Sequence, residues 1–370
     1  MEKLRLGLVG CGGMMWTHAM GINAISEQLE ITAVCDVVLE QAEKTAAVLN
    51  NPYVTTDYRT MVDYVDAVLI ALPHDLHYEC GMFFAWRKKH ILMEKPLCNT
   101  EEECLSLITT CEQENVVLMC AYPVRFFPGI RKLKELVDSG DYGRVMQMSI
   151  WTEQLTTTKP EHYMRWTATA RLGGGQFFSH GCHYIDLLLW FLGNPVKGCH
   201  MGTRVGTPWI LKEGTSTAIM QFENGALGYH GATWGGRGTK IGSDFQVQTE
   251  KGMLEYHRYD DEIRLYDGSV EHIPGVIEEK FPYKVLWKGT NERDAKGGPS
   301  KHTQFEILHF LDCVQNGKKP MIDGRAALQS LRVIWAMYDA EKHNEVADLR
   351  GLGLEQVDPT ETLSYEWYTK

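Results

Sequence analysis

A glycine-rich turn near the start of the chain limits the possible folds more than any other stretch. The apolar run Leu4–Val9 has the length of a strand, and Gly10-Cys11-Gly12-Gly13 follows it directly. The residue pattern then predicts a helix over Trp16–Ile25 and a second strand over Ile31–Cys35, which ends at Asp36. Strand, glycine turn, helix, strand and acid follow one another in the order that a dinucleotide-binding unit requires.

The glycines and the acid each suit one part of a dinucleotide. The first glycine permits the tight turn, and the second lets the backbone approach a pyrophosphate that rests on the start of the helix. Asp36 suits the ribose hydroxyls and repels a 2′-phosphate, and the Val37-Val38 pair after it offers no arginine or serine. We therefore expect NAD rather than NADP. The cofactor-binding candidates here are Gly10, Gly12, Gly13, Met14 and Asp36.

The bulk composition excludes several classes of protein. The chain has 370 residues, enough for two domains, and a formal net charge of −11 without a long basic run, which argues against nucleic acid as the main partner. No apolar stretch approaches the roughly 20 residues that a membrane span needs. The ten cysteines are scattered and the N-terminus has no signal-peptide pattern, so we expect a cytoplasmic protein with reduced thiols.

The order of predicted strands and helices changes character at Tyr122. Before it, strands alternate with helices, which predicts an α/β domain with a doubly wound parallel sheet over residues 1–122. After it, strand-like runs dominate and one helix, Gly181–Phe191, interrupts them. We therefore expect an α+β domain with a large, open, mostly antiparallel sheet over residues 123–345, and a C-terminal tail over residues 346–370.

Two motifs follow predicted strands at the carboxyl edge of the first sheet, where doubly wound folds bind ligands. In Glu94-Lys95-Pro96, Lys95 could donate a hydrogen bond to a substrate oxygen or lower the pKa of a nearby acid, although most lysines in such places simply face solvent. The other motif follows a strand that ends at Ala71, and its second histidine is expected near the nicotinamide end. The cofactor-binding candidates at this edge are Pro73, His74, His77, Glu94 and Lys95.

The densest polar stretch runs from Gly173 to Asp186. His183 and Asp186 are three residues apart and share one face of the predicted helix. A histidine with a pKa near neutrality can remove a proton from a hydroxyl while a hydride leaves the same carbon, and Asp186 could orient that imidazole. His180 and His183 could in principle bind zinc, but no third ligand is evident, so we expect no metal site.

Six motifs together point to one family. They are the glycine turn, Pro73-x-x-x-His77, Glu94-Lys95-Pro96, Arg125-Phe126-x-Pro128, Gly173-Gly174-Gly175 and His183-x-x-Asp186. In order and spacing they resemble the glucose–fructose oxidoreductase and inositol dehydrogenase (Gfo/Idh/MocA) family over nearly the whole chain. The resemblance implies a Rossmann domain, a second domain whose open sheet often forms a dimer or tetramer face, bound NAD or NADP, and oxidation or reduction at a secondary carbon of a sugar, cyclitol or glycoside.

The resemblance also assigns catalytic roles, and the chain departs from the family pattern at one position. In that pattern Lys95 and His183 form the catalytic pair, and an aspartate stands four residues before the histidine. Here that position is Ser179, with His180 beside it. Either His183 works with Lys95 alone, or His180 or another residue takes over the missing role. The catalytic candidates are Lys95, His183, His180 and Asp186.

A sugar pocket needs aromatic faces for the apolar side of a pyranose, and an arginine suits an acidic group. The alternative places the aromatic side chains in the core and the charged ones in solvent. The substrate-binding candidates are Tyr122, Arg125, Trp151, Glu153, Tyr163, Arg165, Trp166, His180 and His183.

These features predict an NAD-dependent sugar or glycoside dehydrogenase that transfers a hydride between NAD and a secondary ring hydroxyl at the C3 position. Two alternatives stay open: an inositol or other sugar dehydrogenase, and a redox-neutral glycoside hydrolase that acts through a transient 3-keto sugar. A dinucleotide-sensing regulator would need neither Lys95 nor His183. The expected partners are a small carbohydrate and further copies of the chain, in a dimer, tetramer or higher homo-oligomer, and neither nucleic acid nor membrane.

Overall fold

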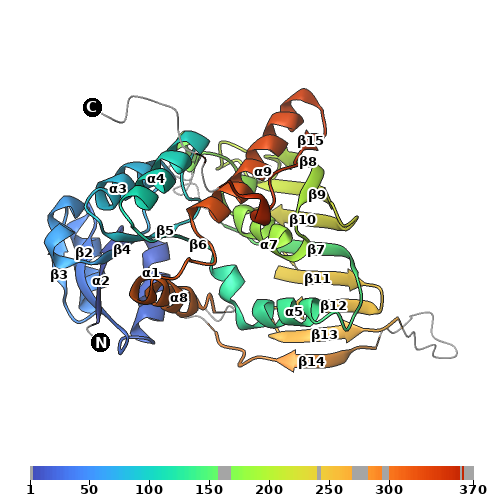
Figure 1. The fold of residues 1–370 in the computed structure, drawn as a ribbon, viewed down its shortest axis with the longest axis horizontal. Coiled ribbons are helices and arrows are strands. Elements are labelled where there is room, and N and C mark those ends of the chain that lie inside the picture. The colour runs from blue at the N-terminus through green and yellow to red at the C-terminus, as the bar shows by residue number, and fades with distance from the viewer. Residues whose placement is uncertain are drawn as a thin grey trace.

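Two β-sheets with their own helices lie side by side in the computed structural model (Figure 1). The structure describes residues 3–156, 168–239, 243–268, 282–293, 300–358 and 361. The first sheet uses the N-terminal third of the chain, and the second uses the remainder. No helix within these ranges has both the length and the apolar character that crossing a bilayer requires.

The first sheet is parallel and confirms the predicted Rossmann-type unit, with the strand order β3-β2-β1-β4-β5-β6. Its central strands β1, β4 and β5 are largely buried, which explains their continuous apolar runs. The strand order reverses between β1 and β4, and the carboxyl ends of these two strands therefore border a crevice for a ligand. The strands are β1 (Leu4–Val9), β2 (Leu29–Cys35), β3 (Tyr53–Thr55), β4 (Ala67–Ile70), β5 (His90–Glu94) and β6 (Leu118–Ala121).

Helices follow the strands of the first sheet, and the first of them begins inside the glycine turn. α1 (Gly13–Asn23) starts earlier than the predicted Trp16, because Gly12 is its extended N-cap residue and Gly13 is already helical. α8 (Thr303–Asn316), which comes from far along the chain, packs against α1 (Figure 1). The other helices of this unit are α2 (Leu39–Ala47), α3 (His77–Ala85) and α4 (Glu101–Gln113).

The second sheet is open, with the strand order β14-β13-β12-β11-β7-β10-β9-β8-β15. All neighbouring pairs are antiparallel except β7 and β10, which confirms the predicted mostly antiparallel sheet. The strands are β7 (Val145–Glu153), β8 (Pro195–Thr203), β9 (Thr215–Phe222), β10 (Leu227–Thr233), β11 (Ser243–Thr249), β12 (Gly252–His257), β13 (Glu262–Tyr266), β14 (Lys284–Lys288) and β15 (Ala347–Asp348).

Helices cover one face of the second sheet (Figure 1). α7 (Cys182–Leu192) packs on β7 and β10, α5 (Pro128–Asp138) packs on β12 and β13, and α9 (Gly324–His343) packs on β8. Short helical turns connect these elements and carry several residues of the site described below. They are η1 (Tyr58–Tyr64), η2 (His74–Leu76), η3 (Pro123–Phe126), η6 (Ala170–Leu172), α6 (Gln176–Ser179) and η7 (Leu354–Gln356).

The segment after residue 345 joins the second sheet, which its weak sequence pattern did not predict. β15 pairs with β8, and Leu349 directly after it is fully buried. The Arg325 guanidinium on α9 donates to the carbonyl oxygen of Asp358 at 2.6 Å. A strand of this length and one anchoring leucine are too short for a periodic pattern, so the first residues of the expected tail belong to the second unit.

Candidate active site

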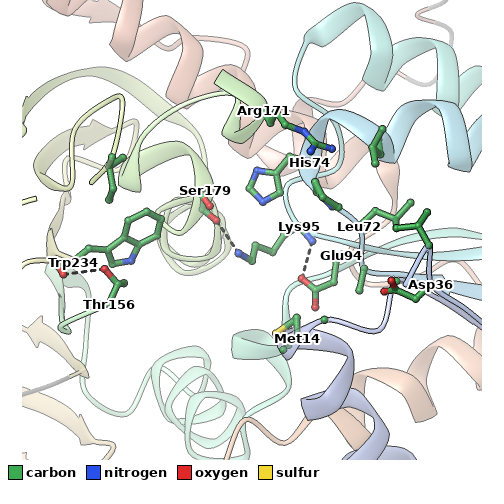
Figure 2. Close-up of a pocket in the computed structure, with 18 of the residues that line it drawn as sticks. Met14, Asp36, Leu72, His74, Glu94, Lys95, Thr156, Arg171, Ser179 and Trp234 are labelled. Atoms are coloured by element: carbon green, nitrogen blue, oxygen red, sulfur yellow. Dashed lines mark hydrogen bonds between the residues drawn. The ribbon is translucent and has the colours of Figure 1, made fainter. Parts of the chain in front are cut away.

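A cavity of about 670 Å³ lies at the carboxyl edge of the first sheet, between the two units. Every predicted cofactor residue except His77 lines it. The second unit supplies the opposite wall, which Figure 2 shows for Thr156, Arg171, Ser179 and Trp234. Trp209 and Ile210 complete this wall, and neither carried a recognisable motif in the sequence.

The glycine turn at the cavity has one glycine that the fold needs and two that it does not. Gly10 has φ +86°, and a Cβ atom there would lie 2.5 Å from the carbonyl oxygen of Ala71. A Cβ atom on Gly12 or Gly13 would meet no described atom within 4 Å. Packing therefore does not require glycine at these two positions. Their bare backbone leaves the start of α1 open to the cavity, as pyrophosphate binding demands.

Asp36 stands at the end of β2 and faces the cavity (Figure 2). Its carboxylate accepts hydrogen bonds from the backbone N–H of Cys11 at 2.7 Å and of Val38 at 2.8 Å, which fixes its orientation. An adjoining hollow of about 120 Å³ also contains Asp36, together with Arg59. The Arg59 guanidinium lies between two carboxylates, 3.3 Å from Asp57 and 3.2 Å from Glu79.

Lys95 reaches from the first unit across to the second (Figure 2). Its Nζ atom donates to the carbonyl oxygen of Ser179 at 2.9 Å, and its backbone N–H donates to Oε2 of Glu94 at 3.1 Å. The lysine thus meets the main chain of Ser179. Lys95 lines the cavity and is partly buried.

His180 and His183 follow Ser179 in the chain, but neither lines the 670 Å³ cavity, and His183 lines none of the described hollows. Their ring centroids are 5.7 Å apart and the rings are nearly perpendicular. Burial, followed by the positive charge of Lys95, holds the pKa of both imidazoles well below its usual range. Both rings are therefore neutral at neutral pH, whereas we expected from the sequence a histidine with a pKa near neutrality. No described residue gives Nδ1 of His183 a hydrogen bond.

A second hollow of about 220 Å³ lies on the far side of His180. Arg258, Lys301 and Glu153 line it together with hydroxyl-bearing side chains. The Lys301 Nζ atom also lies 3.7 Å from the sulfur of Met14, so this lysine reaches from the hollow to the glycine turn. Glu153 was predicted in the substrate site, but Arg258 and Lys301 were not, because only the folded sheet and the approach to α8 bring them to the histidines.

Asp186 and Arg125 were predicted to serve catalysis and substrate binding, and the structure gives them another role. The Arg125 guanidinium donates two hydrogen bonds to the Asp186 carboxylate, at 2.6 and 2.7 Å, and both side chains are buried. Neither residue lines the cavities described here. Asp186 thus faces Arg125 on η3 rather than the imidazole three residues before it, and the pair joins two elements of the fold.

Three further candidates are displaced from the cavity. His77 is fully buried, with its ring nitrogens 2.8 Å from the carbonyl oxygen of Pro96 and 3.0 Å from that of Leu72, so it joins two loops. Tyr122 is fully buried, and its ring lies 5.4 Å from that of His183. The Trp151 ring packs on Tyr229 at 4.8 Å. Tyr163, Arg165 and Trp166 lie outside the described residues.

No group of three histidine, cysteine, aspartate or glutamate side chains with metal-binding geometry occurs in the described part of the chain. Cys182, next to both histidines, is buried, and its sulfur lies 3.7 Å from the carbonyl oxygen of Ser179. Lys95, which lines the cavity, and the nearby imidazoles of His180 and His183 can form hydrogen bonds and transfer protons.

Comparisons with known proteins agree with this geometry. The family model "Oxidoreductase family, NAD-binding Rossmann fold" matches residues 4–122, and "GFO/IDH/MocA C-terminal domain" matches residues 130–255. D-xylose 1-dehydrogenase (NADP(+)) 2 from Haloferax volcanii is 23% identical over 91% of this chain and 99% of its own length. A 2,7-anhydro-N-acetylneuraminate hydratase from Mediterraneibacter gnavus is 28% identical over 74% of this chain and 78% of its own. The solved levoglucosan dehydrogenase complex with NADH superposes with a TM-score of 0.81 at 21% identity, covering 94% of this chain and 99% of that one, which shows the fold.

Proposed function

Because the chain belongs to the Gfo/Idh/MocA family of NAD-binding oxidoreductases, we propose that it moves a hydride between NAD and a secondary ring hydroxyl, at the C3 position, of a sugar or glycoside. One observation carries this proposal: the Lys95 ammonium crosses the cavity to Ser179, directly before His180 and the start of the helix that holds His183. A proton donor thus lies close in the chain to two neutral imidazoles, at the edge of the sheet where a dinucleotide binds.

The residues present fit the cofactor. Gly12 and Gly13 would hold the pyrophosphate with backbone N–H groups, and Asp36 would accept from a ribose hydroxyl. Bound NAD⁺ supplies the hydride acceptor. In the direction of oxidation His183 takes the proton of the ring hydroxyl, and Lys95 donates a hydrogen bond to the same oxygen as its charge develops. His180 supplies the second imidazole where the family aspartate is missing.

The first test is a substrate panel. The purified protein is incubated with NAD⁺ and O-glycosides, C-glycosides, free sugars and inositols, and the masses of the products are measured by mass spectrometry. We expect one substrate class to lose two hydrogens while an equal amount of NADH forms. Conversion of a panel member without a matching oxidised product would contradict a simple dehydrogenase.

A second candidate function is favoured by the pair of buried imidazoles. A transient ketone at C3 acidifies the proton on C2, and removing that proton expels the group on C1. His180 and His183 give the site one base for the oxidation and another for the elimination. The similarity to a relative named as a hydratase agrees with chemistry beyond net redox. Release of an aglycone without accumulated NADH in the same panel would favour this reading.

Asp36 is expected to set the preference for NAD over NADP. We predict that Asp36→Ala lowers kcat/KM for NAD⁺ by roughly 10- to 100-fold, because a charge-assisted hydrogen bond to the ribose contributes about 1.5–3 kcal/mol. The value for NADP⁺ should fall less or rise, since the repulsion of the 2′-phosphate disappears. Initial rates with both cofactors measure this preference. Asp57→Asn is the control, because Asp57 contacts Arg59 without lining either hollow. An unchanged cofactor ratio in Asp36→Ala would contradict the assignment.

We also propose that the chain forms a homo-oligomer through the face of the second sheet that α7 and α9 leave uncovered. Half-exposed apolar side chains lie there on neighbouring strands, among them Ile219, which pairs with Cys199 and Tyr229. Met201 on the same side of β8 is 67% exposed. Such a face suits an isologous contact between two copies. Sedimentation equilibrium should give a mass of at least two chains, and a monomer at micromolar concentration would contradict the proposal.

A further inference from the structure

A buried cluster of ionisable side chains reaches the cavity through Glu94, and the chemistry proposed above does not use it. It comprises His18 on α1, Glu94 at the end of β5, and Glu306 on α8. The Nε2 atom of His18 lies 2.7 Å from Oε1 of Glu94, and its Nδ1 atom lies 3.9 Å from Oε1 of Glu306. The imidazole thus stands between two carboxyl groups that come from different parts of the chain.

The two carboxyl groups differ sharply in their hydrogen bonding. One oxygen of Glu94 is hydrogen-bonded to the His18 imidazole, and the other accepts a hydrogen bond from the backbone N–H of Lys95. The Glu94 side chain also lines the cavity. Glu306 is 0% exposed, and neither of its oxygens has a hydrogen-bond partner among the described residues. A carboxylate in such a place would be an uncompensated buried charge, which costs far more than a buried neutral acid.

The charges around the cluster decide where its proton sits. His18 and the positive charges of Lys95 and Lys301 favour the anionic form of Glu94, and its pKa is lowered although burial opposes this. Around Glu306 the facing groups are His18 on α1 and Glu94 on β5. Burial and the negative charge of Glu94 raise the pKa of Glu306 well above its usual range. Two carboxyl groups that share one site rarely ionise together, and here the partnered group is the one that ionises.

We propose that Glu306 is a positioning residue that keeps its proton and, through His18, holds Glu94 as a carboxylate in the cavity wall beside Lys95. The cluster packs Glu306 of α8 against His18 of α1, and His18 in turn contacts Glu94 at the strand end before Lys95. The position of α8 therefore influences Glu94 and, next to it, Lys95, which lines the cavity. The effect of this positioning role on turnover rests on the proposed function, whereas the protonation of Glu306 does not.

The protonation is tested by unfolding the full chain without cofactor between pH 5 and 8.5. In the unfolded chain a glutamate ionises near pH 4.3, whereas in the folded chain Glu306 keeps its proton to higher pH. Its contribution to stability is therefore complete at low pH and declines as pH rises above the unfolded value, by up to about tenfold in the folding equilibrium constant per pH unit. Glu306→Gln cannot ionise and lacks this decline. The stability of the variant relative to the wild type should increase with pH.

Two further variants keep this test decisive. Glu306→Met is also neutral and replaces a side chain that has no described hydrogen bond, so it reports the same trend if the glutamine variant fails to fold. Thr303→Val alters the same contact between α8 and α1, where the Thr303 hydroxyl donates to the carbonyl oxygen of Thr17, without touching an ionisable group. Its pH profile should run parallel to that of the wild type. Parallel profiles for all three variants would overturn the proposal.

The positioning role has its own readout. We expect His18→Gln to lower kcat by about tenfold to a hundredfold through misplacement of Glu94 and Lys95, while the KM for NAD⁺ changes little. Thr303→Val should keep both values. An unchanged kcat in His18→Gln overturns the positioning role. Full turnover in a Lys95 variant, by contrast, would overturn the proposed function and leave the protonation of Glu306 standing.

Discussion

Replacing Lys95 with alanine should lower kcat by about 10²- to 10⁴-fold, the range over which a positioned proton donor or acceptor contributes to a reaction. The Lys95 Nζ atom bridges the two units at Ser179, directly before His180 and the helix that holds His183. Without Lys95, the negative charge that develops on the substrate oxygen would lose the cation that this lysine supplies after β5. The affinity for NAD⁺ should change little, because the glycine turn and Asp36 remain in place.

Two measurements separate these effects. Single-turnover reduction of NAD⁺ reports the chemical step, and a fluorescence titration with NADH reports cofactor binding. Lys44→Ala is the matched control, since Lys44 is an exposed lysine on α2 of the same unit. Lys95→Ala with full turnover would remove this lysine from the mechanism, whereas a loss confined to NADH affinity would make it a cofactor residue alone.

Asp186→Ala should destabilise the fold by about 3–5 kcal/mol, the cost of leaving the partner of a buried ion pair without its counter-charge. Arg125 donates two hydrogen bonds to Asp186 in a site that is closed to water, and it also donates to the carbonyl oxygen of Met321. In the variant the guanidinium keeps its charge and loses the carboxylate. Urea unfolding should therefore show a large decrease in the midpoint with little change in slope.

An exposed ion pair serves as the control for this prediction. Asp348 and Arg350 form such a pair, and Asp348→Ala should leave the unfolding midpoint nearly unchanged. The double variant Arg125→Met/Asp186→Leu should recover much of the stability that Asp186→Ala loses. Where Asp186→Ala is still folded it should retain turnover, because both carboxylate oxygens of Asp186 are taken by Arg125 and not by an imidazole. A folded variant with strongly reduced kcat would restore a catalytic role to this aspartate.

The Rossmann unit and its cofactor edge were predictable because their signals are local. The apolar run before Gly10, the glycines and Asp36 all lie within one short stretch, and a strand buried on both faces needs a continuous apolar run. The Glu94-Lys95-Pro96 motif lies at the end of a parallel strand, and this position alone predicts that Lys95 lines the cavity. In these cases the chain neighbours of a residue decide its environment.

The failures concern residues whose partners lie far along the chain. The spacing of His183 and Asp186 places both on one helix face, but it does not show that Arg125 approaches that helix and takes the carboxylate. Arg258 and Lys301 reach His180 only through strand pairing and the approach to α8. Glu306 reads as an ordinary polar residue of an amphipathic helix, and only the packing of α8 on α1 buries it beside His18.

Transfer of a hydride from a ring carbon to NAD can be followed directly with an isotope label. The protein is incubated with NAD⁺ and a pyranoside that carries deuterium only at C3, and the mass of the NADH formed is measured. We expect the deuterium to appear in the NADH and the step to be slower than with the unlabelled sugar. Oxidised sugar accompanied by unlabelled NADH, or conversion of the sugar with the deuterium still on C3, would contradict it.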